Sequence, residues 1–327
     1  MAADTISGPS LDTHWLPALD HLVPVPAAFR EVSLDLPTAA RELGCSPEVL
    51  TALVAAGLPA EHGSDGPRFD PHDVMNLGLL SGTGRSSAEL GERRLMRLAT
   101  GTAAEWVIER NWRIAFSASC SAAGCTDVAR PVRPAPELLG GRLTQWRADL
   151  ADPSAVQAVL STRGRLDTVR TGAVREIYDD LLDALRTGHY RYGWVPRKMS
   201  ADASVDVFGM MNCMVAAASM RDRAAAAGIA ARIRRGVLLG FVGVEHAWTE
   251  VLEEDRWVAL DPVLGLLAGR TPGSNPEFAD FCRGSLSNRL LTWDGDGALT
   301  EHRCSAGGLA SLSCRPTPIP SSDTEGA

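Results

Sequence analysis

The stretch VEHAWTEVLEEDRWVALDP, residues 244–262, carries the strongest structural signal in this sequence. Two runs rich in β-branched and aromatic residues, 244–252 and 256–261, are separated by an acidic turn, and Pro262 closes the second run. Runs of this composition joined by a short polar segment are typical of antiparallel strands. The stretch therefore predicts a β-hairpin.

The hairpin places two side chains with acid–base chemistry near each other. Side chains alternate between the faces of a strand, so His246 shares a face with Trp248. With an even number of loop residues, His246 and Asp261 face the same side, directly opposed or on a diagonal. With an odd number, Asp261 would share its side with Ala247 instead.

The segment NCMVAAASMRDRAAAA, residues 212–227, precedes the hairpin and predicts a buried central helix that ends at Gly228. Cys213 falls in the first turn. There the free N–H groups and the aligned peptide dipoles favour a thiolate and can also receive an oxyanion. Asn212 and Trp194 are possible further oxyanion donors, but a helix cap and a core residue explain them equally well.

A thiol at a helix N-terminus, followed by a His and an Asp on a hairpin, supplies the parts of a nucleophile, base and base-orienter triad. The pattern N-C…G-I-A-A-R…H-A-W-T-E-V…W-V-A-L-D-P, within residues 174–264, resembles the transglutaminase-like superfamily. The matching residues are Cys213, Gly228, Ile229, Arg232, His246, Ala247, Trp248, Glu250, Val251, Trp257, Asp261 and Pro262.

This resemblance implies an α+β fold with a transglutaminase-like core of the papain-like cysteine protease type. It also implies Cys213 as the nucleophile, His246 as general base and acid, and Asp261 as the residue that orients His246. The superfamily alone does not fix the reaction, because water, an amine or a carbon nucleophile can each resolve the same acyl-enzyme.

The N-terminal part contains a candidate winged helix-turn-helix module at residues 36–74. Short helices are expected at 37–43 and 47–56, with Gly44 as a stop and Ser46 as an N-cap, and the run resembles modules of the excisionase type. We do not expect DNA binding. Residues 31–80 hold eight acids and two bases, Arg41 and Arg68, which are too few to replace phosphate counterions.

The expected domains are a helical domain over 1–128, a catalytic domain over 129–314 and a disordered tail over 315–327. The boundary is placed at the start of the Pro- and Gly-rich segment at 129–142.

A capping box, Ser86-Ser87-Ala88-Glu89, predicts a helix through about Arg97. Gly82-Thr83-Gly84 lacks the Lys and the spacing of a phosphate loop and is interpreted as a turn.

The whole chain has 327 residues, a formal charge of −8 and 45% hydrophobic residues. This acidic balance argues against a general nucleic-acid or anionic-membrane binder. The first ten residues lack the basic and apolar parts of a signal peptide, and no apolar run approaches the roughly 20 residues of a membrane span. Seven cysteines without an export signal indicate reduced thiols, so we expect a cytoplasmic protein.

Length and architecture narrow the expected reaction. A helix-turn-helix-like module ahead of a triad domain resembles bacterial Dieckmann cyclases that release tetramic acids or pyridones from carrier proteins. The resemblance implies that Cys213 accepts a β-ketoacyl-aminoacyl chain from an acyl or peptidyl carrier protein thioester, without a cofactor. The alternatives are a hydrolase, peptidase or amide-forming acyltransferase on the same triad, and a non-enzymatic helix-turn-helix binding protein.

Two further groups of residues bear on partners and metals. Residues 186–235 hold nine bases and three acids, which is consistent with an acidic carrier partner or with a solvated surface. Cys120-x4-Cys125 and the later Cys282, His302, Cys304 and Cys314 lack the paired rhythm of zinc ligands, so no metal is predicted. His14, His21, His62, His72 and His189 show no ligand spacing either.

Overall fold

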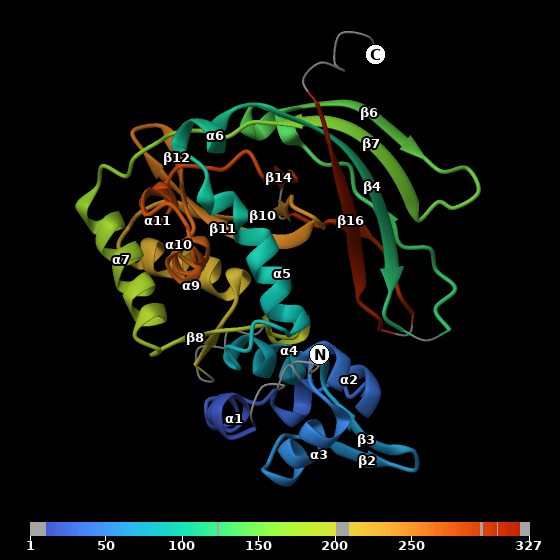
Figure 1. Ribbon diagram of the computed structural model, residues 1–327. Helices are drawn as coiled ribbons and strands as arrows, with labels where there is room; N and C mark the ends of the chain where they lie inside the picture. Colours follow the sequence, from blue (N-terminus) through green and yellow to red (C-terminus); the bar gives the residue numbers. More distant parts are fainter. Residues whose placement is uncertain (1–10, 123, 201–208, 295–296, 306, 321–327) are drawn as a thin grey trace, which may run out of the picture. The chain divides into compact units, whose positions relative to one another are not determined.

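The computed structural model describes residues 11–122, 124–200, 209–294, 297–305 and 307–320 (Figure 1). The chain divides into two compact units. Unit 1 comprises Met1–Arg94 and Thr187–Val215, and unit 2 comprises Leu95–Arg186 and Ala216–Ala327. The boundary expected at 128/129 therefore falls inside unit 2, and a later segment returns to unit 1.

The Pro-rich segment at 129–142 is structured rather than a linker. It contains strand β5 (Arg130–Pro131), which pairs with β15 (Thr300–Glu301), and the 3₁₀ helix η4 (Pro136–Leu139). Gly140 ends η4 in the left-handed region, with φ 80°. The composition shift thus marks closely spaced turns in a β-rich unit.

Unit 1 is built on short capped helices. Helix α2 (Leu36–Leu43) ends at Gly44, whose φ is 66°, and α3 (Pro47–Ala55) begins at Ser46, whose hydroxyl accepts from Val49 N. These bounds agree with the two helices predicted there. Whether this segment is a winged helix-turn-helix module stays a prediction.

The remaining elements of unit 1 surround α2 and α3. The N-terminal elements are η1 (Leu11–Trp15), α1 (Leu16–Asp20), η2 (Ala27–Phe29) and the sheet β1-β3-β2, formed by Leu34–Asp35, Gly66–Phe69 and Glu61–Gly63. Helix α4 (Pro71–Leu80) follows, and α5 (Ser87–Leu95) opens with the predicted capping box between Ser86 and Glu89. Parallel strands β8 (Arg191–Tyr192) and β9 (Met210–Met211), with α8 (Arg197–Ser200), complete the unit.

A buried carboxyl on α4 gives unit 1 a pH dependence. Asp73 accepts from Val25 N at 2.7 Å, and burial raises the pKa of its carboxyl from 3.8 to about 6. The folded state therefore holds a proton that the unfolded state releases, so stability falls as pH rises from about 4 to 6. Asparagine cannot ionise, so Asp73→Asn avoids this loss of stability. The variant should have a free energy of unfolding about 2 kcal/mol higher at neutral pH.

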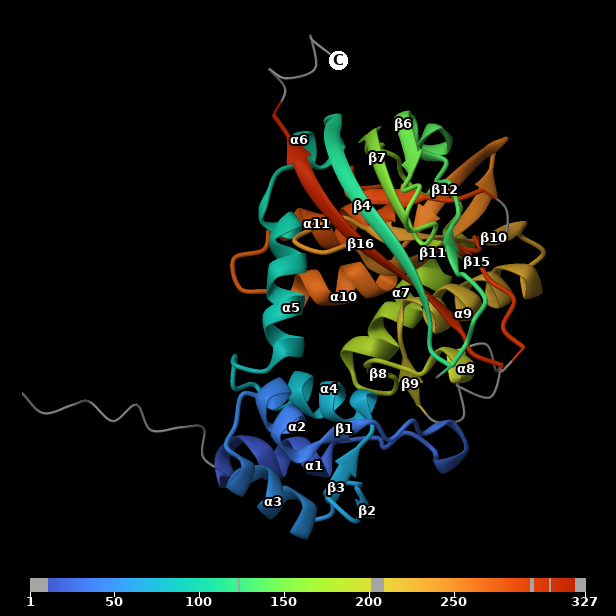
Figure 2. The ribbon, with the colours of Figure 1, turned by 90° about the vertical axis from the view of Figure 1, so that its right-hand side faces the viewer.

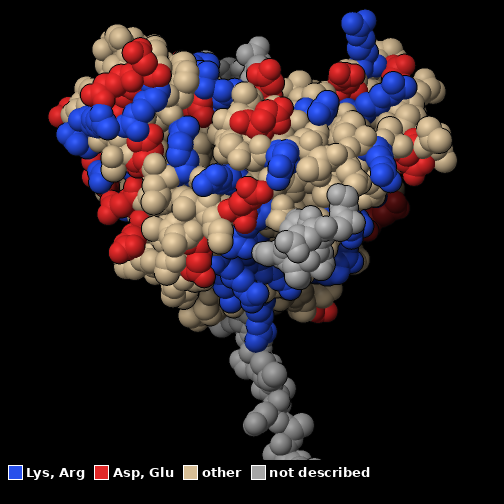
Figure 3. Space-filling model, turned by 90° about the horizontal axis from the view of Figure 1, so that it is seen from above, with Lys and Arg blue, Asp and Glu red and all other residues tan. Residues whose placement is uncertain are grey.

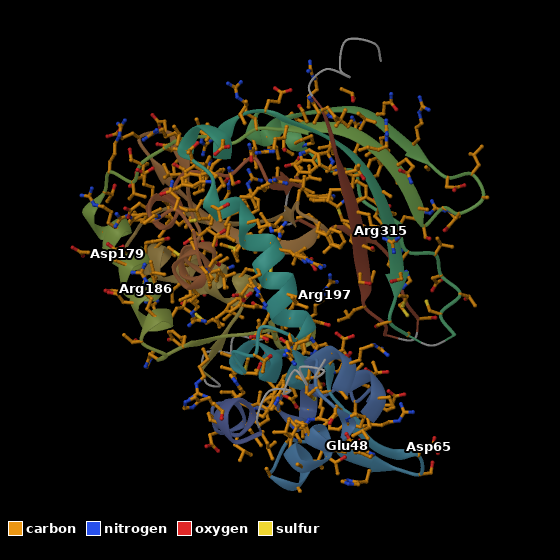
Figure 4. The ribbon with its side chains drawn as sticks, viewed as in Figure 1. Glu48, Asp65, Asp179, Arg186, Arg197 and Arg315 are labelled. Atoms are coloured by element: carbon orange, nitrogen blue, oxygen red, sulfur yellow. The ribbon has the colours of Figure 1, made fainter. Side chains whose placement is uncertain are left out.

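Urea unfolding at several pH values measures this effect. The gain of Asp73→Asn should fade towards zero near the lower end of the window. Asp65→Asn in the exposed β2–β3 turn (Figure 4) is the control and should change stability little at any pH. A gain for Asp73→Asn that is constant over the whole range would contradict the assignment.

Unit 2 contains a four-stranded antiparallel sheet in the order β16-β4-β7-β6. Its strands are β4 (Arg110–Cys120), β6 (Arg142–Ala148), β7 (Ala155–Thr162) and β16 (Ala310–Ile319). The expected disordered tail is therefore wrong for 315–319, where Arg315 lies on β16 (Figure 4). Residues 321–327 of that tail lie outside the described residues. Pro316 and Pro318 fit because β16 is an edge strand, where a missing N–H costs no ladder bond.

A second sheet of unit 2, in the order β13-β12-β11-β10-β14, carries the predicted hairpin. Its strands are β10 (Ala231–Leu238), β11 (Val244–Glu253), β12 (Arg256–Leu260), β13 (Arg283–Gly284) and β14 (Leu290–Thr292). Both sheets contribute to one hydrophobic core, which includes Trp112, Phe116 and Leu160 of the first sheet and Val237 and Leu291 of the second.

Helices cover the other side of the second sheet (Figure 1 and Figure 2). They are α7 (Gly172–Arg186), α9 (Cys213–Ala226), α10 (Pro262–Arg270) and α11 (Glu277–Phe281). The unit also contains η3 (Met96–Thr100) and α6 (Ala103–Val107). Arg283 at β13 donates to Asp179 of α7, with Nη1 3.0 Å from both carboxylate oxygens.

Among the described residues, no helix has the length and hydrophobicity needed to cross a membrane.

Candidate active site

The predicted hairpin is present, and its loop has two residues. Strands β11 and β12 pair from Glu253↔Arg256 to Thr249↔Leu260. Glu254 and Asp255 form the loop with φ values of 46° and 65°, as a tight turn between right-twisted strands requires. The even loop resolves the alternative left open by the sequence, because continuing the register sets Asp261 on the face of His246 and Trp248.

His246 and Asp261 form a buried hydrogen-bonded pair. Nε2 of His246 lies 2.6 Å from Oδ2 of Asp261, and each residue is 5% exposed. With the shared proton on Nε2, the lone pair of the imidazole is on Nδ1, the nitrogen that can accept a proton from a thiol. The geometry thus supports the predicted orienting role of Asp261.

The carboxylate of Asp261 is fixed by two elements at once. Its Oδ1 accepts from Leu264 N at 3.0 Å and caps α10, so only Oδ2 is directed at His246. Tyr178 of α7 donates its hydroxyl to the backbone carbonyl of Asp261 at 3.4 Å. Burial raises the pKa of Tyr178 well above its usual value, so this hydroxyl stays protonated as a donor.

Cys213 is the first residue of α9, as predicted, and its side chain is half-buried. Asn212 acts as the cap, because its Oδ1 accepts from Val215 N at 3.0 Å. Trp194 is 37% exposed, which does not support its alternative role in the core. Farther along the helix, Thr249 of β11 donates to Ala217 O at 2.9 Å and ties α9 to the sheet.

The division of the chain separates the predicted triad. His246 and Asp261 belong to unit 2, whereas Cys213 belongs to the last stretch of unit 1. Within unit 2, the structure brings His246 and Asp261 together through a direct hydrogen bond.

An ion cluster around a buried glutamate stabilises the strand that carries His246. Glu250 is 2% exposed, and its Oε2 accepts from Arg232 Nε at 2.8 Å and from Arg234 Nε at 2.9 Å. The Arg232 guanidinium also lies 3.8 Å from the ring centroid of Trp257. Three of the residues that carry the family resemblance, Arg232, Glu250 and Trp257, thus stabilise the hairpin and the neighbouring strand β10.

One group of side chains comes together that the sequence did not indicate. Cys120, Cys125, His302 and Cys304, interpreted as unrelated residues, have ligand atoms that all lie within 4.8 Å of one another. Spacing along the chain gave no sign of this cluster, because its two halves are more than 170 residues apart. Cys282 and Cys314 are not part of it and are buried.

A surface hollow of about 600 Å³ lies elsewhere in unit 2. Its lining consists of Ala104, Val107, Ile108, Glu109, Arg163, Gly164 and Leu166. None of the predicted triad residues lines it, so it is no candidate for the acyl pocket that the triad would need.

Comparisons with known proteins show which family this part of the chain is similar to. Residues 159–262, 104 of the 327, match the transglutaminase-like superfamily and include all three predicted triad residues. The match confirms the predicted transglutaminase-like core.

Comparisons over the whole chain give no further information about its activity. No protein of curated function matches the sequence significantly. A crystal structure described as a putative cysteine protease from Cytophaga hutchinsonii is similar at 13% identity and a TM-score of 0.32, over 65% of this chain and 92% of that one. This similarity is too low for a transfer of activity.

Cys213 should be the most reactive of the seven thiols. Burial raises the pKa of Cys45 to about 11 and that of Cys314 to about 12, and it raises the pKa of Cys282 well above its usual value. Cys213 instead sits at a capped helix N-terminus. Iodoacetamide at about pH 6, followed by peptide mass spectrometry, should modify it first. Earlier labelling of Cys45, Cys120 or Cys282 would contradict the assignment.

Proposed function

We propose that this protein is a cysteine-dependent acyl-transfer enzyme in which Cys213, His246 and Asp261 form the triad. The 2.6 Å bond between His246 and Asp261 carries the proposal, because the carboxylate engages Nε2 and so favours the tautomer in which Nδ1 is the base. The approach of Cys213 Sγ to His246 Nδ1 is part of this proposal. Its support is the helix start at Cys213 and the family match that spans all three residues.

The first half of the reaction forms an acyl-enzyme. His246 Nδ1 takes the proton of the Cys213 thiol, and the thiolate attacks the carbonyl carbon of a thioester. The backbone N–H groups at the start of α9 can stabilise the oxyanion. When the tetrahedral intermediate collapses, the C–S bond to the carrier breaks, and the leaving thiolate takes the proton that His246 holds.

In the second half, we propose that carbon resolves the acyl-enzyme in a Dieckmann cyclisation. Neutral His246 takes a proton from the acidic carbon between two carbonyls of the bound chain, and the carbanion attacks the acyl carbon. A C–C bond forms as the bond to Cys213 breaks, and the thiolate recovers its proton from His246. The product is a tetramic acid or pyridone ring. This finer assignment is supported by the resemblance in length and architecture.

The charge distribution supports an acidic carrier partner less than the count of bases in 186–235 does. Most bases counted in 186–235 have an acidic neighbour: Arg186 with Asp183, Lys198 with Glu31, Arg221 with Asp222, Arg232 and Arg234 with Glu250, and Arg235 with Glu245. On the face seen in Figure 3, basic and acidic side chains are interspersed, apart from one basic group low in the view. Shape and backbone contacts would therefore have to supply part of any carrier recognition.

A synthetic β-ketoacyl-aminoacyl thioester of a small thiol tests the reaction. The enzyme should release the ring product slowly, because the binding energy of a carrier is missing. Cys213→Ala should release none, and Cys45→Ala, which changes a thiol outside the triad, should behave as the wild type. Free acid alone, or an amide when amines are added, would identify a hydrolase or acyltransferase instead. No reaction, with no acyl group on Cys213, would contradict the triad itself.

A further inference from the structure

The cluster of Cys120, Cys125, His302 and Cys304 lies where two pairs of strands end in unit 2. Cys120 is the last residue of β4 and pairs with Ala310 at the start of β16. His302 directly follows β15, which pairs with β5. The loop after β4 and the loop before β16 thus meet at this point, and each supplies two of the four side chains.

Two distances within the cluster are close to those between the ligands of a tetrahedral zinc ion. Sγ of Cys120 lies 3.6 Å from Sγ of Cys304, and Sγ of Cys125 lies 3.6 Å from Nε2 of His302. Bonds of about 2.3 Å to sulfur and about 2.0 Å to nitrogen give edges of about 3.8 Å between sulfurs and about 3.5 Å between sulfur and nitrogen. All four ligand atoms lie within 4.8 Å of one another, so small side-chain movements would close the remaining distances around an ion.

The backbone around Cys120 is shaped for a ligand sulfur. Ala122 N lies 3.4 Å from Cys120 Sγ, a contact that stabilises a thiolate. Gly308 passes so close that an added Cβ would lie 2.5 Å from the same sulfur and 2.6 Å from Ala122 Cβ. Only glycine leaves this sulfur in its present position.

We propose that these four side chains bind one Zn²⁺ ion in a structural Cys₃His site. Three thiolates and an imidazole are a ligand set typical of closed zinc sites, which keep no open position for a substrate. Binding would displace the thiol protons and join the two loops, much as a disulfide would. The site uses none of the triad residues, so it does not depend on the proposed function.

Metal analysis of the full chain tests the site. Protein purified under reducing conditions without chelator should contain about one zinc per chain. Replacement by Co²⁺ should give intense visible bands and a sulfur-to-cobalt charge-transfer band. His302→Ala should lose the metal on dialysis against a chelator. His302→Cys, which keeps four ligands, should retain it, and so should Cys45→Ala.

The spectrum of the cobalt-loaded wild type needs no variant, so the test holds even if His302→Ala does not fold. Absence of zinc from the wild type together with no charge-transfer band after cobalt addition would overturn the proposal. Zinc content unchanged by both His302→Ala and Cys125→Ser would also overturn it. A Cys120–Cys304 disulfide in protein kept under reducing conditions would show that these sulfurs serve a redox pair instead.

Discussion

Alanine in place of Cys213 is expected to lower the rate of acyl transfer by about six decades, because removing the nucleophile of a triad leaves only binding and oxyanion stabilisation. The side chain is half-buried at the start of α9, and alanine is an excellent helix former, so the fold should be kept. Rates with the synthetic thioester and the mass of the acylated protein measure the effect. Acylation should disappear together with turnover.

The matched control is Cys45→Ala, which changes another partly buried thiol in unit 1. It should leave the rate unchanged and cost only a little stability. A Cys213→Ala enzyme that still accumulates an acyl adduct on another residue would assign the nucleophile elsewhere. An adduct on Cys120 or Cys304 would also argue against the zinc site.

The hairpin was predictable because its signals are local. Alternation and turn composition place both strands within a residue of their observed ends. The parity of the loop was not predictable, since Glu254 and Asp255 adopt positive φ without the glycine that usually announces such a turn. The pairing of His246 with Asp261 depended on that parity, so the sequence defined the pair only as one of two alternatives.

Three features were missed because they depend on contacts between distant residues. Cys120 and Cys304 are 184 positions apart, and only the pairing of β4 with β16 brings them together. The prolines of β16 resemble a coil in isolation, yet an edge position in the sheet tolerates them. The amino-acid composition gives no sign that Thr187–Val215 belongs to unit 1. Contacts between distant residues hold it there, because Asn76 hydrogen-bonds both the backbone N–H and the carbonyl of Trp194.

Asparagine in place of Asp261 is expected to lower the rate by about four decades while the fold is kept. Oδ1 of the wild-type carboxylate caps α10 through Leu264 N, and the amide oxygen of asparagine can take over that bond. The amide nitrogen then faces His246 Nε2 and donates to it. The imidazole must carry its proton on Nδ1, so the nitrogen that should accept the thiol proton has no lone pair to offer.

Asp35→Asn is the matched control, because Asp35 also caps a helix, through Thr38 N at 2.9 Å, but takes no part in the proposed triad. That variant should change stability slightly and leave the rate unchanged. If Asp261→Asn slowed the reaction only through lost stability, its rate would recover at lower temperature, whereas a wrong tautomer persists in the folded enzyme. Near-normal turnover of folded Asp261→Asn would mean that another group orients His246. The carboxylate of wild-type Asp261 would then serve only to cap α10.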